Sequence, residues 1–306
     1  MTHFMDKVIG AFGNSSSHFY VIYLASTAAM AIACFWLSSS KVRQQGILHF
    51  LFPRTVWLHP SALTDYGYVL LTIPLWKYFV SSLIEFAPQM GTWVQSVIST
   101  FLHTPSGGFF PGVGISVAYT VALVAVTDFK RYWVHRLMHR VPVLWEFHKV
   151  HHSAEVLTPI TFYRSHPVDM LAQGVTDAVG IGLVTGIFLF LCPEGLSAVT
   201  ILGANAIRFL FLFFGANLRH SHIWLSYGFK AEHVIISPAQ HQIHHSVDRA
   251  HHDRNFGSEF AIWDLMFGTL FLAGKKQTLK FGLGEDEDRK LASVPQLYLR
   301  PFRALL

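Results

Sequence analysis

The sequence from residue 128 to residue 152 reads DFKRYWVHRLMHRVPVLWEFHKVHH and follows a long apolar segment. His135 and His139 are four residues apart, so on a helix they lie on one face and can direct both imidazoles toward a common centre. The histidines of the run 148–152 stand at positions i, i+3 and i+4, which also share a helix face. The stretch therefore predicts helices that each gather histidines on one side.

The same His-x-x-His-His spacing returns at His241, His244 and His245, and His220 stands alone before it. Histidine is abundant throughout, with 19 residues against 18 Asp plus Glu. The three clusters together hold eight imidazoles, whereas a zinc ion in a protein takes about four ligands. The spacing therefore favours two metal ions.

The histidines leave the identity of the metal open, because imidazole binds iron, zinc, copper and nickel. A zinc peptidase of the His-Glu-x-x-His type is disfavoured, since Arg136 follows His135. A soluble carboxylate-bridged di-iron bundle would use Glu-x-x-His pairs, which these clusters lack. A haem site would leave most of the histidines unexplained.

The composition indicates a membrane protein. Of the 306 residues, 52% are hydrophobic and 13% charged, against about 25% charged in an ordinary soluble domain. This composition excludes a disordered chain and a soluble nucleic-acid binder, and we attribute the net charge of +5 to cytoplasmic loops. Cys34 and Cys192 lie in apolar runs, so a disulfide framework is also excluded.

Five stretches are apolar enough to cross a bilayer, which takes roughly 17–25 helical residues. They are 19–38, 66–84, 109–127, 170–192 and 196–218. Lys and Arg are frequent after the first, third and fifth stretches and absent from 87–108 and 192–195. The positive-inside rule then predicts an external N-terminus and a cytoplasmic C-terminus. In this topology the last two stretches form a hairpin, which puts all the histidine clusters on the cytoplasmic face.

Two further features of these stretches predict contacts between helices. Gly182 and Gly186 form a small-xxx-small pair, which would let the fourth stretch pack closely against a neighbour. Asp177 and Arg208 are costly inside a membrane and lie on the two arms of the predicted hairpin. We therefore expect them to form an ion pair.

The histidine clusters carry a resemblance to a known family, and other motifs extend it. These motifs are Asp128 and Tyr132 before the first cluster, Arg164-Ser165-His166-Pro167, Asn255-Phe256-Gly257, and Trp263-Asp264-Leu265-Met266-Phe267-Gly268-Thr269. Over residues 109–272 the chain resembles the fatty acid hydroxylase superfamily, also called the sterol desaturase family, of integral-membrane di-iron oxygenases.

This resemblance implies an all-α integral membrane protein, a bundle of about four to five transmembrane helices with a cytoplasmic helical cap that holds a His-rich di-metal site. It divides the chain into a membrane anchor region (1–108), a catalytic domain (109–272) and a cytoplasmic tail (273–306). Carried over residue by residue, the metal ligands are His135, His139, His148, His151, His152, His166, His220, His241, His244 and His245. His166 ranks below the others, since some family members have no histidine there.

Several residues keep more than one interpretation. His222 is compatible with a ligand, a hydrogen-bond donor behind the ligands or a spectator, and Asp264 could orient a ligand histidine or fix the turn at 255–257. We expect structural roles for His233, His251 and His252. We expect no role in the site for His3, His18, His49, His59 and His103.

The function that the resemblance implies is hydroxylation or desaturation of a membrane lipid, such as a fatty acyl chain or a sterol, by two iron ions (Fe2+/Fe3+) with O2 as co-substrate. No catalytic residue beyond the metal ligands is expected. Two electrons would come from a separate donor, a ferredoxin or a cytochrome b5 type protein with an NAD(P)H reductase. The location would be the bacterial inner membrane, or the endoplasmic reticulum in a eukaryote. An alkylglycerol monooxygenase-like ether cleavage and, less favoured, a divalent-metal transporter are the alternatives.

Overall fold

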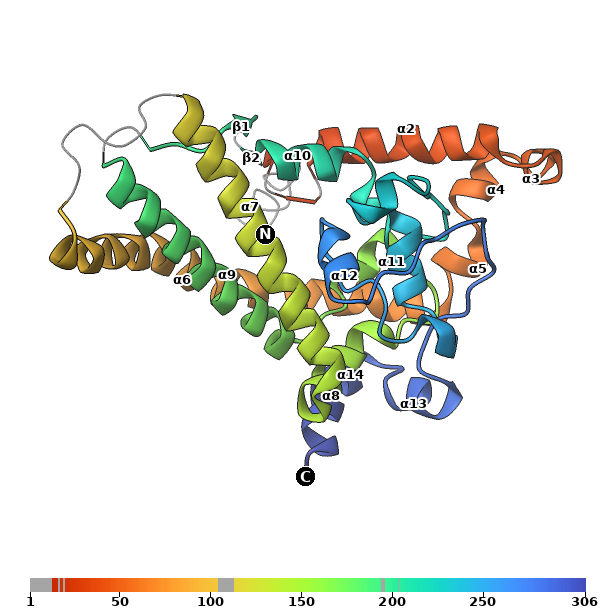
Figure 1. Ribbon diagram of the computed structural model, residues 1–306. Coiled ribbons are helices and arrows are strands. Elements are labelled where there is room, and N and C mark those ends of the chain that lie inside the picture. Colours follow the sequence, from red (N-terminus) through yellow and green to blue (C-terminus); the bar gives the residue numbers. More distant parts are fainter. Residues whose placement is uncertain (1–12, 16, 19, 104–112, 194–195, 203) are drawn as a thin grey trace.

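The computed structural model describes residues 13–15, 17–18, 20–103, 113–193, 196–202 and 204–306, and most of them are helical (Figure 1). The α-helices are α2 (Val21–Leu37), α3 (Ser40–Gln44), α4 (Ile47–Leu51), α5 (Arg54–Trp57), α6 (Pro60–Phe101), α7 (Val113–Arg140), α8 (Pro142–His152), α9 (Pro167–Leu191), α10 (Ala206–Phe213), α11 (Pro238–His244), α12 (Ile262–Met266), α13 (Glu285–Lys290) and α14 (Val294–Ala304). Short 3₁₀ turns are η1 (Pro159–Tyr163), η2 (Ala216–Leu218), η3 (Ala231–His233) and η4 (Arg249–His251), and β1 (Thr200–Ile201) pairs with β2 (Ala204–Asn205) in an antiparallel hairpin.

Long helices and short ones occupy different parts of the molecule. In Figure 1, α6, α7 and α9 spread toward the left of the view, while the short helices α11 to α14 lie to the right and below. The helix α7 ends at Arg140, and α8 begins two residues later with Pro142 in its first turn, where proline is favoured. This tight junction turns the chain from the long helices into the layer of short ones.

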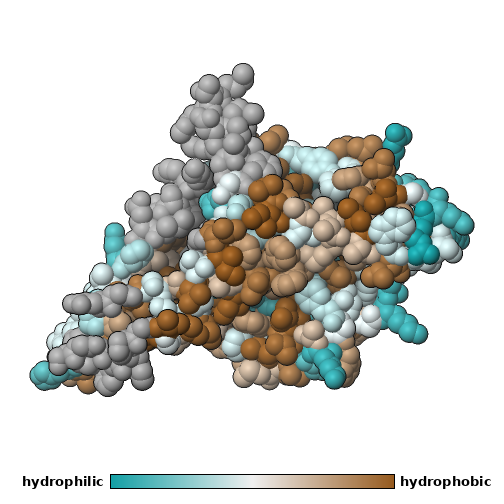
Figure 2. Space-filling model, turned by 90° about the horizontal axis from the view of Figure 1, so that it is seen from above, coloured by the Kyte–Doolittle hydropathy of each residue, from teal (hydrophilic) through white to brown (hydrophobic). Residues whose placement is uncertain are grey.

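The described part of the chain has two helices, α7 and α9, that are long and apolar enough to cross a membrane, and α2 is a shorter apolar helix. Both long helices expose apolar side chains, among them Val117 and Val121 on α7 and Leu183 and Ile187 on α9. Figure 2 shows hydrophobic residues over much of the face seen from above. Large exposed apolar surfaces mark contact with lipid or with other proteins, and the number of spans stays a prediction.

Four of the five predicted apolar stretches correspond to helices. The stretches 19–38, 66–84, 109–127 and 170–192 coincide largely with α2, α6, α7 and α9, although residues 19 and 109–112 lie outside the described residues. The helix α6 continues past the predicted end of its stretch to Phe101, with Pro74 and Pro88 inside it.

The fifth predicted stretch, 196–218, is wrong as a single spanning helix. It contains the β1–β2 hairpin, the eight-residue helix α10 and the turn η2. Asn205 begins α10, because its side-chain oxygen accepts a hydrogen bond from the Ile207 N–H at 3.1 Å. Gly215 follows α10 with a φ of 97°, a conformation that favours glycine. The hydropathy of the stretch reflects its apolar residues and does not reveal the helix start at Asn205 or the turn at Gly215.

The predicted ion pair between Asp177 and Arg208 is also wrong. Asp177 instead lies 3.1 Å from Lys130 and 3.2 Å from Arg131, both on α7. Arg208 lies 3.7 Å from the carboxylate of Glu259. Because 196–218 does not form the second arm of a spanning hairpin, the two residues are not brought face to face.

The predicted close packing of Gly182 and Gly186 is confirmed, and the neighbour is α6. A Cβ atom on Gly186 would lie 2.5 Å from the Val94 Cβ and 2.6 Å from the Gly91 carbonyl oxygen. A Cβ atom on Gly182 would lie 2.5 Å from the Met90 Cγ. The two glycines therefore allow the backbones of α6 and α9 to approach each other closely.

We predict that Gly186→Ala destabilises the protein by roughly 1–3 kcal/mol, because the new methyl group meets backbone as well as a side chain and forces the two helices apart. The measurement is reversible unfolding of the detergent-solubilised chain, followed by its helical circular dichroism. Gly114→Ala is the matched control on α7, since a Cβ at Gly114 has no neighbouring atom within 4 Å. Equal stability of the two variants would contradict the packing argument.

Candidate metal centre

The structure brings nine histidines together in two groups of buried or half-buried imidazoles. The first group, called here the five-histidine group, consists of His135, His139, His148, His152 and His244. The second, the four-histidine group, consists of His151, His220, His241 and His245. Within each group the nitrogens that could bind a metal all lie within 4.8 Å of one another.

The His-x-x-His-His spacing explains why there are two groups. In α8 the outer pair, His148 and His152, joins the five-histidine group, and the middle residue His151 joins the other. At α11 the outer pair, His241 and His245, joins the four-histidine group, and the middle residue contributes to the first. Each His-x-x-His-His run therefore contributes two histidines to one group and one histidine to the other.

Local sequence fixes the helix α11 that carries one of these runs. Ser237 caps its first turn, since its hydroxyl oxygen accepts a hydrogen bond from the Gln240 N–H at 3.2 Å. The Gln240 side-chain oxygen accepts in return from the Ser237 N–H at 2.9 Å, which completes a capping box with Pro238 in the first turn. The start of the helix, and with it the direction of its histidines, is therefore set by the residues just before them.

The free ring nitrogens of the five-histidine group fit a metal ion. The Nε2 atoms of all five members are buried and have no hydrogen-bond partner. The opposite nitrogen, Nδ1, of His135 lies 2.9 Å from the Phe256 carbonyl oxygen, and that of His244 lies 2.7 Å from the Arg254 carbonyl oxygen. A carbonyl only accepts, so Nδ1 carries the proton and Nε2 presents a bare lone pair. Such unpartnered nitrogens are costly when buried, unless a cation binds them.

The four-histidine group shows the same chemistry in a more crowded form. The Nε2 atom of His220 lies 3.1–3.2 Å from the Nε2 atoms of His151, His241 and His245. Nε2 has one proton at most, so N–H···N bonds cannot satisfy all three contacts. His151 also donates from Nδ1 to the Arg164 carbonyl oxygen at 3.3 Å, which leaves its Nε2 bare. The donor set therefore fits a second metal ion, with histidine as the common ligand type.

Burial keeps these histidines in the form that binds metals. It lowers the pKa of His151 to about 4 and, chiefly by the same desolvation, the pKa of His244 to about 3. Both side chains are therefore neutral near pH 7, and the neutral imidazole is the form that acts as a ligand.

Asp264 combines the two interpretations that its sequence context left open. Its carboxylate accepts hydrogen bonds from the backbone N–H groups of Phe256 and Gly257, each at 2.8 Å, and from the Thr269 hydroxyl. It therefore fixes the turn at 255–257, as predicted. The same turn places the Phe256 carbonyl against His135 Nδ1, so Asp264 orients a ligand histidine through the backbone.

Two carboxylates that help to position the candidate ligands, Asp169 and Asp65, were not singled out by sequence. Asp169 in the first turn of α9 lies 2.7 Å from His148 Nδ1 and holds that ring directly. Arg164 is fully buried and pairs with Asp65 at 2.8 Å, so its carbonyl is rigidly placed beneath His151. Asp169 stands 21 residues from its partner, and no local pattern connects the two. The Arg164-Ser165-His166-Pro167 motif was the available signal for Arg164.

His166 lies apart from both groups, in contrast to the prediction that it is a ligand. Its Nδ1 accepts a hydrogen bond from the Val168 N–H at 3.1 Å and so caps α9. Its Nε2 donates to the Tyr298 carbonyl oxygen at 3.1 Å. Both nitrogens are engaged, which leaves none for a metal, and the residue instead ties α9 to the C-terminal helix α14.

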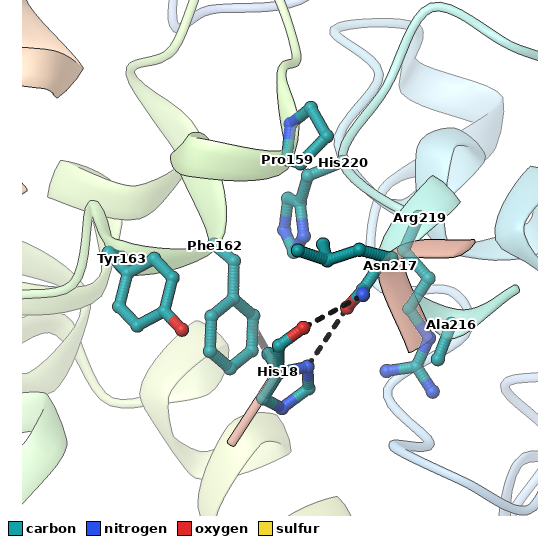
Figure 3. Close-up of a pocket in the computed structure, with 9 residues that line it drawn as sticks. His18, Pro159, Phe162, Tyr163, Ala216, Asn217, Arg219 and His220 are labelled. Atoms are coloured by element: carbon teal, nitrogen blue, oxygen red, sulfur yellow. Dashed lines mark hydrogen bonds between the residues drawn. The ribbon is translucent and has the colours of Figure 1, made fainter. Parts of the chain in front are cut away.

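Of the histidines outside both groups, His3 lies outside the described residues, and His222 and His233 bind backbone carbonyl groups. His222 donates to the Phe50 carbonyl oxygen at 2.7 Å, and His233 donates to the Phe229 carbonyl oxygen at 2.7 Å. His18, predicted to have no role in the site, lines a small pocket that reaches His220. Figure 3 shows His18 facing Asn217, and two hydrogen bonds of 3.1 Å join them. The two residues are 199 positions apart, so no local sequence pattern predicts this contact.

Comparison with known proteins agrees with the site. The family model described as fatty acid hydroxylase matches residues 120–269, which include all nine clustered histidines. The chain is 25% identical, over 94% of its length, to an ornithine lipid hydroxylase of Rhizobium tropici, and the match covers 88% of that protein.

Two other relatives match a smaller part of the chain. Identity is 27% over 49% of this chain to an alkylglycerol monooxygenase of Homo sapiens, and 28% over 50% to a Delta(7)-sterol 5(6)-desaturase of Aspergillus fumigatus. The matches cover 30% and 48% of those two proteins, so the chain spans less than half of either. No solved structure matches this chain.

We predict that His148→Ala and His241→Ala each remove metal from one group and leave the other group able to bind. If each group holds one ion, bound metal falls from about two ions per chain to about one in either variant, and nearly to zero when both are combined. The measurement is elemental analysis of anaerobically purified protein. His252→Ala is the control, because this exposed ring donates to the Val247 carbonyl outside both groups. Metal content unaffected by either ligand variant would refute the assignment.

We also predict that Asp169→Ala weakens metal binding by roughly 10–100-fold, the usual effect of losing the residue that orients a ligand histidine. The variant leaves His148 in place but removes the acceptor for its Nδ1 proton. Asp169→Asn should lose less, because its amide oxygen still accepts that hydrogen bond. Competition with a chelator measures both affinities, and identical values for Ala and the parent protein would exclude the positioning role.

Proposed function

This chain belongs to the fatty acid hydroxylase superfamily, and from that premise we propose that it is a membrane-bound di-iron oxygenase that hydroxylates a lipid. The observation that carries the proposal is the pair of buried histidine groups with bare Nε2 atoms. The names of its relatives supply the substrate class, because they refer to an ornithine lipid, an alkylglycerol and a sterol.

The chemistry requires a metal, since amino-acid side chains cannot attack an unactivated C–H bond. Two irons, when bound, would react with O2 and use two electrons from the separate donor. In the overall reaction one oxygen atom enters a C–H bond of the lipid, and the other leaves as water with two protons. Desaturation uses the same oxidant and electrons, removes two hydrogen atoms from the lipid and releases two molecules of water.

The chain itself holds the ligands in place and admits the substrate. The Nδ1 hydrogen bonds of His135, His148 and His244 fix three rings, so the bare nitrogens need little reorganisation when a metal binds. The pocket shown in Figure 3 is bordered by His220, a member of the four-histidine group. This group has fewer nitrogens than the other, and in the proposal it is the one that the lipid approaches.

Electrons come, in this proposal, from a separate donor of the ferredoxin or cytochrome b5 type with its NAD(P)H reductase. The positive-inside pattern of the loops supports a cytoplasmic position for the histidine groups. The membrane would be the bacterial inner membrane, or the endoplasmic reticulum if the source is a eukaryote. Nucleic acid is not among the proposed partners.

Ether cleavage is the second candidate function, and the similarity to alkylglycerol monooxygenases favours it. Hydroxylation of the carbon next to an ether oxygen gives a product that breaks down to an aldehyde and an alcohol, so the same metal site would serve. A metal transporter is less favoured, because a cargo site must release its ion, whereas these groups are buried and their rings are held by hydrogen bonds.

We predict that the iron-loaded protein in lipid nanodiscs consumes O2 only with a reduced ferredoxin and a lipid present. Mass spectrometry of the lipids after reaction under 18O2 separates the functions. A gain of one labelled oxygen identifies hydroxylation, a loss of two hydrogens identifies desaturation, and a labelled aldehyde from an ether lipid identifies cleavage.

The His148→Ala/His241→Ala double variant is the control for this assay, since it removes one histidine from each group. Turnover by this variant at the parent rate would refute the metal-dependent oxygenase. So would a parent protein that binds zinc tightly, binds no iron under anaerobic loading and oxidises none of the lipids tested.

A further inference from the structure

The pocket at His220 is small, and one cation lines it. Its volume of about 40 Å³ has room for roughly three water-sized groups. Apolar and aromatic residues such as Leu24, Pro159 and Phe162 form much of the wall, and Arg219 brings a positive charge. Burial lowers the pKa of His18 to about 3, so this histidine is neutral and adds no charge to the pocket.

Arg219 differs from the other cations near it. Lys130 and Arg131 pair with Asp177, and Arg208 lies 3.7 Å from Glu259. No ion pair among the described residues includes Arg219. The guanidinium is charged at neutral pH, because an arginine side chain is not deprotonated in proteins.

Arg219 makes no direct contact with a carboxylate, although the charges of Glu259 and Asp128 act on it from a distance. One terminal nitrogen donates to the Ser258 carbonyl oxygen, and the guanidinium carbon lies 4.4 Å from the centre of the Phe211 ring. Its Nε atom is buried and has no hydrogen-bond partner. A guanidinium has five N–H donors and pairs best with a carboxylate or a phosphate. Arg219 is half-buried, and an anion bound directly to its guanidinium would add a charge-assisted hydrogen bond that the more distant Glu259 and Asp128 do not provide.

We propose that Arg219 binds the anionic group of the lipid substrate, a carboxylate or a phosphate, in the pocket beside His220. The inference rests on the proposed oxygenase function and adds the substrate's charge to it. Arg219 and the candidate ligand His220 both line the pocket, so the anionic group would bind near the metal centre.

His18 and Asn217 complete this site as its wall. The Asn217 side-chain nitrogen donates to the His18 carbonyl oxygen, and His18 Nδ1 donates to the Asn217 side-chain oxygen, each at 3.1 Å. The His18 ring packs against Phe162, with ring centres 4.4 Å apart (Figure 3). His18 thereby closes one side of the pocket, next to the place where the anion would bind.

The test measures binding and requires no turnover, so it can fail independently of the oxygenase assay. The full chain in detergent is titrated with oleate, with dioleoyl phosphatidic acid and with uncharged monoolein, and lipid retention is followed by native mass spectrometry. Loss of the charged contact in Arg219→Gln should weaken binding of at least one anionic lipid by roughly tenfold to a hundredfold. Binding of monoolein should not change.

The pattern across the two anionic probes identifies the source of the anion. A loss confined to oleate indicates a carboxylate lipid, a loss confined to phosphatidic acid indicates a phospholipid, and a loss of both indicates a site for either group. Arg208→Gln is the matched control, because Arg208 does not line the pocket and already has a carboxylate neighbour. It should bind all three probes as the parent does.

A second variant guards against a folding defect in Arg219→Gln. Asn217→Asp is nearly isosteric and puts a carboxylate beside Arg219 on the pocket wall, so it should lower the affinity for anionic lipids while monoolein still binds. The proposal is overturned if both variants bind the anionic probes like the parent, or if they lose monoolein to the same extent as the anionic probes.

Discussion

The constraint on which the structure depends is the convergence of nine imidazoles on two centres a few ångströms across. Buried nitrogens with no partner oppose folding, because each has lost its hydrogen bond to water. The arrangement becomes favourable when cations occupy the centres, so metal binding and folding of this region are coupled. The helices α8 and α11 contribute most to this coupling, since the His-x-x-His-His run of each supplies histidines to both groups.

The hydrogen bonds that orient the candidate ligand histidines go to backbone carbonyl groups more often than to side chains. The carbonyl groups of Phe256, Arg254 and Arg164 each accept a proton from a ligand ring. A carbonyl is only as well placed as its segment, and the structure fixes those segments with buried carboxylates. Asp264 holds the turn at Phe256, and Asp65 holds Arg164 through a 2.8 Å ion pair. The few carboxylates of this region therefore support the histidines and belong to neither group.

Sequence spacing predicted the metal centre better than hydropathy predicted the membrane part. Ligand positions follow the 3.6-residue period of a helix, and this local rule found eight of the nine clustered histidines, while His220 came from the family resemblance. The resemblance also offered His166, which instead precedes a helix and caps it. A motif match does not reveal which way a ring at a helix start points. Hydropathy failed at 196–218, where Asn205 and Gly215 divide an apolar stretch. Asp169 and His18 depend on contacts distant in sequence, which no local pattern contains.

The failed fifth stretch changes the reason why the histidine blocks meet. A spanning hairpin was expected to return the chain to the same membrane face, but the structure joins the blocks by direct contact. Asp128 on α7 accepts hydrogen bonds from the backbone of Glu259 and Phe260 and from the Trp263 indole, which binds the second block to the first. Glu259 in turn lies close to Arg131 and Arg208. The charges that a membrane hairpin would have had to bury thus connect α7, α10 and the segment after α11, and they leave Arg219 without an ion pair among the described residues.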